Sequence, residues 1–548
     1  MKRRRYLELV GVAVGASLSG CNWFSGARTP RTSGRPTPAA ESGGADTTNR
    51  SSTPTPTPGE RFGTVLDAVA DVGCDPSGEN PCDGAVRDAI ADDTLIEFPP
   101  GEYLVTEPLL VERDIRFGIR GLGDDRREVR FVHPSGYSDL LLNVRDGRGC
   151  LFENFTADQT ADRATNSGFV FLQHDGLRVR DVEVAGFSPT EGGSIDMIVQ
   201  ILDESGVGVV ERYVRRGGAE VGVYPDAWQG FYAGRKHHGT LRLVDCHVEE
   251  AGSNGVYATR TDGQVQVIGG VFKNNAVSQV RVSGEGSFVR NARIVIDTES
   301  ADRVAGTYNA VRGIWWESGE FGKTGGAVEN CEFVVESAEL ERGLVEVDGT
   351  GGSMAVRDCE FRIDRDGFWA LVASPPGVSS MGGAPDRPWN VTLEGVRIAG
   401  SASDNVAVQI DGRPDTTVDG LTVDQTSGTD RDGILLANCP GAELLDATCR
   451  TSRYPLWVYT DESVGNANCL LRLEGTVLTS TAVDRRQLAP VFDTDGSGTS
   501  EGSSGESEVC VPLPSGGRYS VVSTREEGGR YLGIRPTTQP PYLVHDRK

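Results

Sequence analysis

Lysine is scarce in this chain. Of its 548 residues only 5 are Lys, whereas 79 are Asp or Glu, and the formal net charge is −25. Nearly all of the basic residues are therefore arginines. An acidic surface with few lysines stays hydrated in concentrated salt, which also screens its self-repulsion, so we predict a halophile's envelope protein. The same charge opposes a general affinity for nucleic acid and argues against that class of partner.

Two further absences narrow the class of protein. Beyond the N-terminus no apolar run is long enough to cross a bilayer, so the mature chain should be soluble apart from any anchor. None of the 11 cysteines belongs to a Cys-x-x-Cys pair, so the sequence predicts no zinc site. Cys74 and Cys82 flank a loop rich in Pro and Gly, and outside the cytoplasm they could close it as a disulfide.

The first 21 residues have the features of an export signal. Residues 2–7 are basic and carry a twin-arginine (Tat)-like pattern, and residues 9–18 form a short apolar run. Leu18-Ser-Gly-Cys21 resembles the cleavage box of a lipoprotein, in which Cys21 becomes the lipidated first residue. We therefore predict a secreted lipoprotein of the haloarchaeal type, anchored by lipid to the outer face of the cell membrane. The alternative is an ordinary secretory signal with a chance Cys. Residues 22–60, rich in Thr, Pro, Ser and Gly, predict a disordered tether.

A repeat of 24 residues identifies the architecture. Residues 241–259 recur at 265–283, with apolar residues at matching positions such as Leu241 and Val265, or Val256 and Val280. Each copy alternates apolar and polar residues, which is the period of a half-buried strand. A short fixed period is typical of stacked units that bury their apolar faces only against one another. Three short strands per period, separated by Gly, Asn and Asp, predict an all-β fold, the right-handed parallel β-helix.

The start of this region resembles a known superfamily. Residues 81–91 have helical spacing, and the strand that follows ends in Phe98-Pro-Pro-Gly-x-Tyr103. This pattern resembles the N-terminal capping helix and first coil of the pectate-lyase-like superfamily, which includes polygalacturonases and phage tailspike enzymes. The resemblance covers residues 61–478, and we assign residues 61–490 to the β-helix. Residues 491–548 are predicted to hold a Gly/Ser linker and a tail or cap.

The resemblance also implies a role for a recurring turn. In this superfamily the Asn or Asp before a small residue lies in the tight turn between the second and third strands of a coil, where it tolerates unusual dihedrals. Cys246, Cys331 and Cys359 each follow such an Asp or Asn, so we interpret them as small buried residues rather than metal ligands. The connections 185–194 and 215–229 are long, which is typical of loops that carry function.

Alignment of the first strand of successive coils predicts two outward columns. One contains Ala233, Tyr257, Arg281, Trp315 and Glu346, and the other contains Arg235, Thr259, Ser283, Glu317 and Asp348; Tyr232 is predicted to point inward. Outward rings can pack on sugars, while Arg and carboxylates bind hydroxyls or acids. In the resembling superfamily this strand face forms the substrate groove. We therefore expect these residues to bind substrate: Tyr257, Trp315, Glu317, Arg235, Glu346 and Asp348. The alternative is a solvated sheet face with scattered aromatics.

Two kinds of chemistry fit these residues. A lyase acting on an acidic polysaccharide needs its uronate carboxylate neutralised, for which Arg281 is the candidate, and a base, for which we name Lys273 or the pair His237 and His238. A surface turn is an equally weighted interpretation of that His pair. A hydrolase needs two facing carboxylates, and Glu317 with Glu346 or Asp348 is the pair that the alignment offers. Because an outward Arg contributes little to a core, Arg281→Ala is expected to leave the β-helix folded.

The motifs of characterised enzymes in the superfamily are missing. Asp-Asp occurs only at residues 92–93 and 124–125, and Gly-His-Gly, Arg-Ile-Lys and Trp-x-Asp-His do not occur. The sequence thus leaves two functions open. One is a polysaccharide-lyase-like surface protein, and the other is a non-catalytic glycan-binding or structural envelope lipoprotein. Asp158 and Asp162 could bind Ca²⁺, although an acidic loop in an acidic protein is the simpler interpretation, and Asp493-x-Asp-Gly496 resembles a fragment of a calcium loop.

Overall fold

The computed structural model describes residues 62–165, 168–189, 195–222, 228–301, 303–308, 311–377, 379, 382–459, 471–474, 476–481, 489–492, 509–511, 518–526 and 529–536. The predicted signal peptide with Cys21, the tether and the fragment 493–496 lie outside these residues. Residues 64–548 form one compact unit, and the fold is that of this unit.

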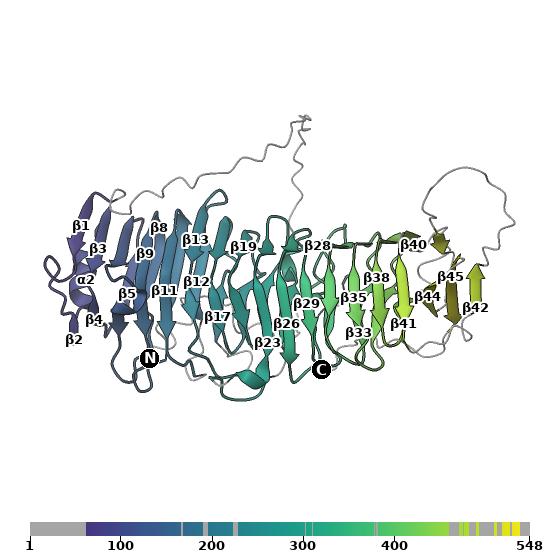
Figure 1. The fold of residues 1–548 in the computed structure, drawn as a ribbon. Helices are drawn as coiled ribbons and strands as arrows, with labels where there is room; N and C mark the ends of the chain where they lie inside the picture. Colours follow the sequence, from purple (N-terminus) through teal and green to yellow (C-terminus); the bar gives the residue numbers. More distant parts are fainter. Residues whose placement is uncertain are drawn as a thin grey trace, which may run out of the picture. The chain divides into compact units, whose positions relative to one another are not determined.

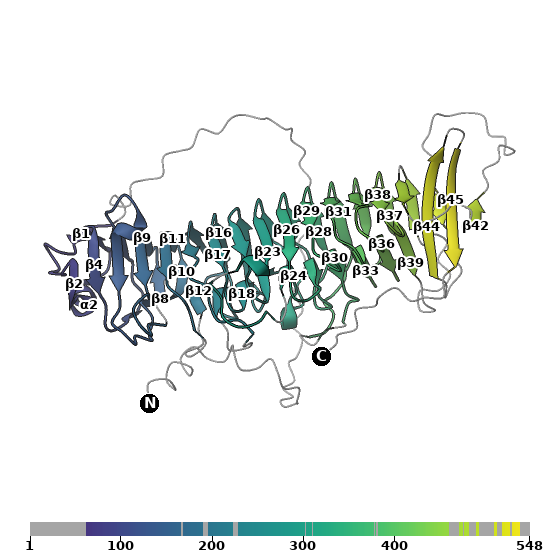
Figure 2. The same ribbon diagram turned by 60° about the horizontal axis from the view of Figure 1, so that its bottom comes forward.

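This unit is a right-handed parallel β-helix whose strands form three rows (Figures 1 and 2). Row 1 is one sheet of parallel strands: β5 (Leu109–Glu112), β8 (Leu142–Arg148), β10 (Phe169–Asp175), β12 (Ile195–Ile201), β15 (Gln229–Tyr232), β18 (Asn254–Ala258), β21 (Ser278–Val282), β24 (Arg312–Trp316), β27 (Gly343–Val347), β30 (Trp369–Ala373), β33 (Val406–Asp411), β36 (Asp432–Ala437) and β39 (Leu456–Tyr459).

Rows 2 and 3 together form the second sheet. Row 2 contains β1 (Thr64–Asp67), β3 (Thr94–Phe98), β6 (Phe117–Gly121), β9 (Leu151–Asp158), β11 (Arg178–Ala185), β13 (Val207–Glu211), β16 (Thr240–Val244), β19 (Gln264–Ile268), β22 (Phe288–Arg290), β25 (Ala327–Glu329), β28 (Met354–Arg357), β31 (Val391–Glu394), β34 (Thr417–Asp419), β37 (Ala442–Leu445) and β40 (Leu471–Glu474). Row 3 contains β2 (Ser77–Pro81), β4 (Gly101–Leu104), β7 (Val129–Val132), the ends of β9 and β11, β14 (Val214–Arg215), β17 (His247–Glu249), β20 (Val271–Lys273), β23 (Arg293–Asp297), β26 (Glu332–Ser337), β29 (Glu360–Ile363), β32 (Arg397–Ala399), β35 (Thr422–Gln425), β38 (Thr448–Thr451) and β41 (Val477–Ser480).

The core lies between the rows and is built from stacked columns of apolar side chains. The predicted matches are confirmed, since Leu241 pairs with Val265 and Val256 pairs with Val280. The Val256 column continues through Ile314, and each member is at most 1% exposed. Burying an aliphatic side chain of this size stabilises the fold by about 1.5–3 kcal/mol, and every coil repeats the gain.

The turn between rows 2 and 3 has the predicted conformation. Asp245, Asn330 and Asp358 have φ angles of 50°, 50° and 51°, in the left-handed region that Asn and Asp tolerate better than most residues. The cysteines that follow them are buried, which confirms that interpretation. Among the described residues no group of His, Cys, Asp and Glu could hold a metal ion.

The first strand of the Tyr232 coil is one residue out of the predicted phase. The structure pairs Phe231 with Val256 and Tyr232 with Tyr257, so Phe231 points inward and Tyr232, not Ala233, belongs to the outward column. Two adjacent aromatics, Phe231 and Tyr232, made either phase compatible with the alternating pattern. The prediction that Tyr232 points inward is therefore wrong.

Helix α2 (Asp83–Ala89) lies in the predicted N-terminal helical segment, beside the first coils (Figure 1). Its Val86, together with Ile90 just beyond its end, joins the main core and buries one side of the helix. In the described part of the chain no helix is long and apolar enough to span a bilayer.

The last strands pair antiparallel, in contrast to the parallel strands of the coils. β44 (Arg518–Glu526) pairs antiparallel with β39, and β43 (Val509–Val511) pairs antiparallel with β40. β45 (Gly529–Pro536) pairs with β44 and with β42 (Ala489–Phe492). The hydrogen-bonding edges of β39 and β40 are thereby occupied, which removes a template for edge-to-edge aggregation.

Cys74 and Cys82 meet in the core as free thiols, both buried and hydrogen-bonded to each other. The disulfide stays a prediction, and the contact gives it a physical basis, because two adjacent thiols can be joined in an oxidising compartment. We expect non-reducing peptide mapping of protein recovered from such a compartment to join the two cysteine peptides. In Cys82→Ser, Cys74 should become alkylated after unfolding. Full alkylation of both thiols in unreduced wild type would contradict the disulfide.

Candidate functional site

Row 1 brings most of the predicted substrate-binding residues into one column. The strand register places Tyr232, Tyr257, Arg281, Trp315 and Glu346 side by side on β15, β18, β21, β24 and β27. These strands lie in the middle of the stack, where β18 and β24 are labelled in Figure 2. The column is therefore continuous over five coils, as the alignment predicted apart from its first member.

Arg281 lies at the centre of this column, between two aromatic rings. Its guanidinium carbon is 4.5 Å from the ring centroid of Tyr257 and 3.7 Å from that of Trp315. Arg312 approaches the same Trp315 ring at 4.1 Å and forms an ion pair of 2.8 Å with Glu346. Stacking on the negative faces of rings stabilises a guanidinium and fixes its plane.

Glu317 is the acidic partner of Arg281. Nε of Arg281 donates to Oε1 of Glu317 over 2.8 Å, and the hydroxyl of Thr259 donates to the same oxygen. The hydroxyl of Ser283 donates to the backbone carbonyl of Glu317. The side chains of Arg281 and Glu317 are 1% and 0% exposed, so this is a buried ion pair held in one geometry.

Two further titratable groups lie beside Glu317. Burial raises the pKa of Asp348, and the charge of Glu317 raises it further. Burial lowers the pKa of Lys323 to about 8, while Glu317 opposes that shift. Nζ of Lys323 donates to the carbonyl of Gly263 over 3.1 Å. The site thus holds a carboxyl with a raised pKa, a paired carboxylate and an amine with a lowered pKa, and perturbed pKa values of this kind are common at catalytic sites.

Connections at the ends of row 1 cover this cluster. Arg235, after β15, forms an ion pair with Glu320, after β24, and so spans the coils between them. Ser379 hydrogen-bonds Asp348, and a Cβ on Gly382 would lie 2.8 Å from the carbonyl oxygen of Gly319. Both Ser379 and Gly382 belong to the long connection between β30 and β31, which therefore lies against the cluster.

Arg413 anchors these connections. It is fully buried and donates to the carbonyls of Asp348, Gly351, Gly352, Ser374 and Trp389 over 2.9–3.2 Å. Its guanidinium donates to loop carbonyls, a role that backbone N–H groups fill in regular strands. The position of Asp348 is consequently fixed from both sides.

The predicted bases lie elsewhere. Nδ1 of His237 accepts from the backbone of Ile201 over 3.1 Å, and Nε2 lies 3.0 Å from the carbonyl of Gln264. Burial lowers the pKa of His237 to about 4, so the ring is neutral and both nitrogens serve the backbone. His238 is paired with Asp262 at 2.7 Å. Lys273 lies in row 3, where Glu249 binds it at 3.2 Å, so it faces away from the Arg281 column.

The expectation of an exposed Arg281 in an open groove is wrong. Tyr257 is 8% exposed and Arg281 1%, whereas Trp315 is half-buried. An outward side chain is exposed only where nothing covers the sheet, and here rings and loops do. The expectation that Arg281→Ala leaves the β-helix folded assumed an exposed Arg281, and Arg281 is buried.

Sequence reasoning missed Lys323, Arg312 and Thr350 as members of the site. Lys323 follows β24 by seven residues, and its burial depends on a loop path that no periodic pattern encodes. Thr350 donates to Oδ1 of Asp348 over 3.0 Å and thereby binds the loops after β24 and β27 together, since the backbone of Gly319 donates to Thr350. The scarcity of Lys in this chain was the one available signal for Lys323.

The acidic residues considered for Ca²⁺ have other partners. Asp158 accepts from Arg130 at its Oδ2 and from Thr160 at its Oδ1, while Asp162 lies 3.2 Å from Arg163. Both oxygens of Asp158 and one oxygen of Asp162 are therefore engaged by donors of the chain.

No protein-family model and no curated protein sequence matches this chain. Among solved structures it is similar to PfbA, a surface adhesin of Streptococcus pneumoniae, at 11% identity over 87% of this chain and 98% of that chain, with a TM-score of 0.41. A DFA-IIIase from Arthrobacter chlorophenolicus aligns at 15% identity over 68% and 93%, with a TM-score of 0.37. The A-module of a mannuronan C-5 epimerase from Azotobacter vinelandii aligns at 13% identity over 76% and 100%, with a TM-score of 0.31. Likenesses this distant carry no argument about the site, and the β-helix rests on its own strand pairing.

The buried pair gives a test of stability. Arg281→Met should lower the free energy of unfolding by about 3–5 kcal/mol, because Glu317 would be left as a buried charge without its partner. Arg281→Met combined with Glu317→Gln should recover much of this loss, since no charge then remains. The measurement is thermal and urea unfolding of wild type, both single variants and the double variant. Additive losses in the double variant would show that the two residues are not coupled.

Proposed function

We propose that the protein acts on a polysaccharide, and that Glu317 and Asp348 are the carboxyl pair that cleaves it by hydrolysis. Asp348 is the proton donor to the leaving oxygen, because its raised pKa keeps the proton to a higher pH than an ordinary Asp. Glu317 is the second carboxylate, held by Arg281 and Thr259. The observation that carries the proposal is the neighbouring position of these two groups on row 1, beside Lys323 and under covering loops.

Hydrolysis is favoured over β-elimination by the state of Arg281. A lyase would use this guanidinium to neutralise a uronate carboxylate. Here Glu317 already neutralises it, and two rings cover its faces. Since His237 spends both nitrogens on backbone partners and Lys273 lies in row 3, the lyase scheme also lacks its proposed bases.

Residues at the edge of the cluster supply contacts for sugar units. Trp315 is half-buried and offers the outward column its most accessible ring, which suits the apolar face of a sugar. Glu320 and Arg235 are exposed and can bind hydroxyls, and Glu346 is half-buried next to Trp315 in the outward column. An acidic sugar remains within the proposal, but its acid group would meet these edge residues rather than Arg281.

A second function, binding of a glycan without cleavage, is favoured by one observation. Glu317 is 0% exposed, so a substrate reaches it only if the covering connections move. If they do not, the edge residues alone would bind the glycan.

The test is product release from a polysaccharide panel in high salt. Reducing ends without unsaturated uronate indicate hydrolysis. Asp348→Asn and Glu317→Gln should each reduce the rate about 100-fold or more, because each removes an acid–base group. Glu394→Gln, which changes an exposed carboxylate on row 2, is the matched control and should act like wild type. Binding that persists with no product at any pH would leave the glycan-binding function instead.

The raised pKa of Asp348 predicts the direction of the pH dependence. The rate should fall as pH rises through that pKa, since the proton donor is lost. Stability should fall over the same interval, because the folded protein holds this proton more tightly than the unfolded chain, whose Asp titrates near a pKa of about 3.9. In Asp348→Asn the unfolding midpoint should no longer show the part of its pH dependence that comes from Asp348. An unchanged pH profile of stability in that variant would contradict the raised pKa.

We further propose that the protein works on the outer face of a halophile's cell, attached by lipid at Cys21. Leu18-Ser-Gly-Cys21 and the acidic, Lys-poor composition motivate this location. Cys21→Ser should release the mature protein into the medium or leave it unprocessed, as fractionation and immunoblotting would show. If Cys21→Ser stayed membrane-bound and fully processed, lipidation at this residue would be wrong.

A further inference from the structure

A cavity of about 250 Å³ lies on a different face from the row 1 site, where rows 2 and 3 meet. Arg126, Arg212, Arg216, His247 and Asp245 line it, and its floor includes the buried Cys246. Asp245 and His247 flank the tight turn between β16 and β17, and Arg216 follows β14. In a chain with a net charge of −25, three arginines converge on this one cavity.

The cavity opens where a ladder of alternating charges stops. Along the outward side of row 2, Glu97, Arg120, Glu153, Arg180 and Glu211 follow one another in register. The next two positions are Val244 and Ile268, and the alternation resumes at Arg290. At these two coils the ladder supplies no charge, and its last charged member before them, Glu211, pairs with Arg212.

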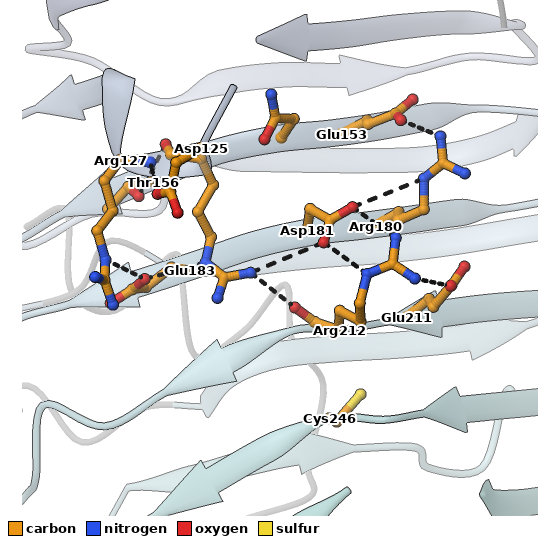
Figure 3. Close-up of polar contacts among 12 residues, drawn as sticks. Asp125, Arg127, Glu153, Thr156, Arg180, Asp181, Glu183, Glu211, Arg212 and Cys246 are labelled. Atoms are coloured by element: carbon orange, nitrogen blue, oxygen red, sulfur yellow. Dashed lines mark hydrogen bonds and ion pairs between the residues drawn. The ribbon is translucent and has the colours of Figure 1, made fainter. Parts of the chain in front are cut away.

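Two of the arginines that line the cavity, Arg212 and Arg126, pair with carboxylates of neighbouring strands. Arg212 forms a two-pronged contact with Asp181, with both nitrogen–oxygen distances at 2.7 Å. Arg126 and Arg127 share one oxygen of Glu183, each at 3.1 Å. Figure 3 shows Asp181 between Arg180 and Arg212, with Cys246 in the turn between β16 and β17. These carboxylates fix the guanidinium planes and thereby preorganise the wall of the cavity.

Arg216 has a different kind of partner. Its Nη2 lies 3.0 Å from Nδ1 of His247, while Nε2 of His247 lies 3.0 Å from Glu249. Because Arg is only a donor, Nδ1 of His247 is the acceptor in this contact. Among the described residues no carboxylate lies within ion-pair distance of Arg216. Arg216 thus brings to the cavity a positive charge that forms no ion pair with a carboxylate of the described residues.

From this arrangement we propose that the cavity binds a small oxyanion, a carboxylate, sulfate or phosphate group, with Arg216 as its main ligand. Arg126 and Arg212 line the same cavity, and each is paired with carboxylates of the chain. The volume is below the roughly 300 Å³ at which pockets begin to hold drug-sized ligands, so the ligand is an inorganic anion or a single acid-bearing sugar unit. Asp245, which lines the same cavity, favours the acid-bearing sugar unit, because its carboxylate can accept a hydrogen bond from a sugar hydroxyl.

The test is titration of the full chain with sodium sulfate, sodium galacturonate and glucose in a chloride background of constant ionic strength. Arg216→Gln should weaken binding of the anions about ten-fold or more, the effect of one charged hydrogen bond. Arg242→Gln is the matched control, because Arg242 is an exposed arginine on β16 whose Nε donates to Gln266 outside the cavity. Far-UV circular dichroism and the unfolding midpoint confirm that both variants fold.

The outcomes distinguish a sugar-borne acid group from an inorganic anion, and both from absence of the site. Galacturonate binding more tightly than sulfate supports a sugar-borne acid group, and equal or stronger sulfate binding supports an inorganic anion. Absence of saturable binding by both anions, equal affinity in Arg216→Gln and wild type, or an equal loss in Arg242→Gln would overturn the site. Because neither variant touches row 1, hydrolysis measured in parallel shows whether the proposed function stands independently.

Discussion

Strands of successive coils lie in register, so each residue of a row has its equivalents in the coils before and after as its nearest neighbours, about 4.8 Å away. Apolar equivalents such as Val256 and Val280 pack continuously, and this column is the core. Like charges at that spacing would repel, and the outward side of row 2 alternates acids with arginines from Glu97 to Glu211 and again from Arg290 to Glu394. The same spacing places Arg281 between Tyr257 and Trp315. Core, charge ladder and candidate site are thus three consequences of one stacking rule.

The sequence was sufficient to predict what the repeat itself encodes. The period of 24 residues gave the pairing of Leu241 with Val265, and Asp or Asn before a Cys gave the left-handed turn at Asp245. Where the repeat is ambiguous the prediction failed, as at Phe231 and Tyr232, whose adjacent rings fit either phase. The prediction that Arg281 is exposed failed for a different reason. An alternating pattern indicates which way a side chain points, but it does not indicate what covers that side chain.

The loops carry the information that the repeat lacks. The position of Asp348 depends on Arg413, which follows β33, more than 60 residues further along the chain. Lys323 is buried beside Glu317 only because the chain after β24 bends back along the row. Neither contact recurs from coil to coil, so neither leaves a periodic signal. The same irregular segments that resist prediction hold the groups with perturbed pKa values, which is where a scaffold of regular coils can acquire chemistry.

Arginine side chains have different roles on row 1 and at the junction of rows 2 and 3. On row 1, Arg281 is enclosed together with its carboxylate, and the pair contributes mainly to the position of Glu317. Where rows 2 and 3 meet, carboxylates bind Arg126 and Arg212, whereas the partner of Arg216 is the imidazole of His247. One chain thus uses the same side chain to position an acid in one place and to present positive charge in another.

The charge ladder limits how such a protein can change length during evolution. Because the sign alternates from one coil to the next, loss of the single coil that carries Arg180 would bring Glu153 beside Glu211, and duplication of that coil would place two arginines together. Loss or gain of two adjacent coils preserves the alternation. We therefore expect natural length variants of this solenoid to differ by even numbers of coils within the ladder, and odd differences to occur at Val244 and Ile268, where no charge has to be matched.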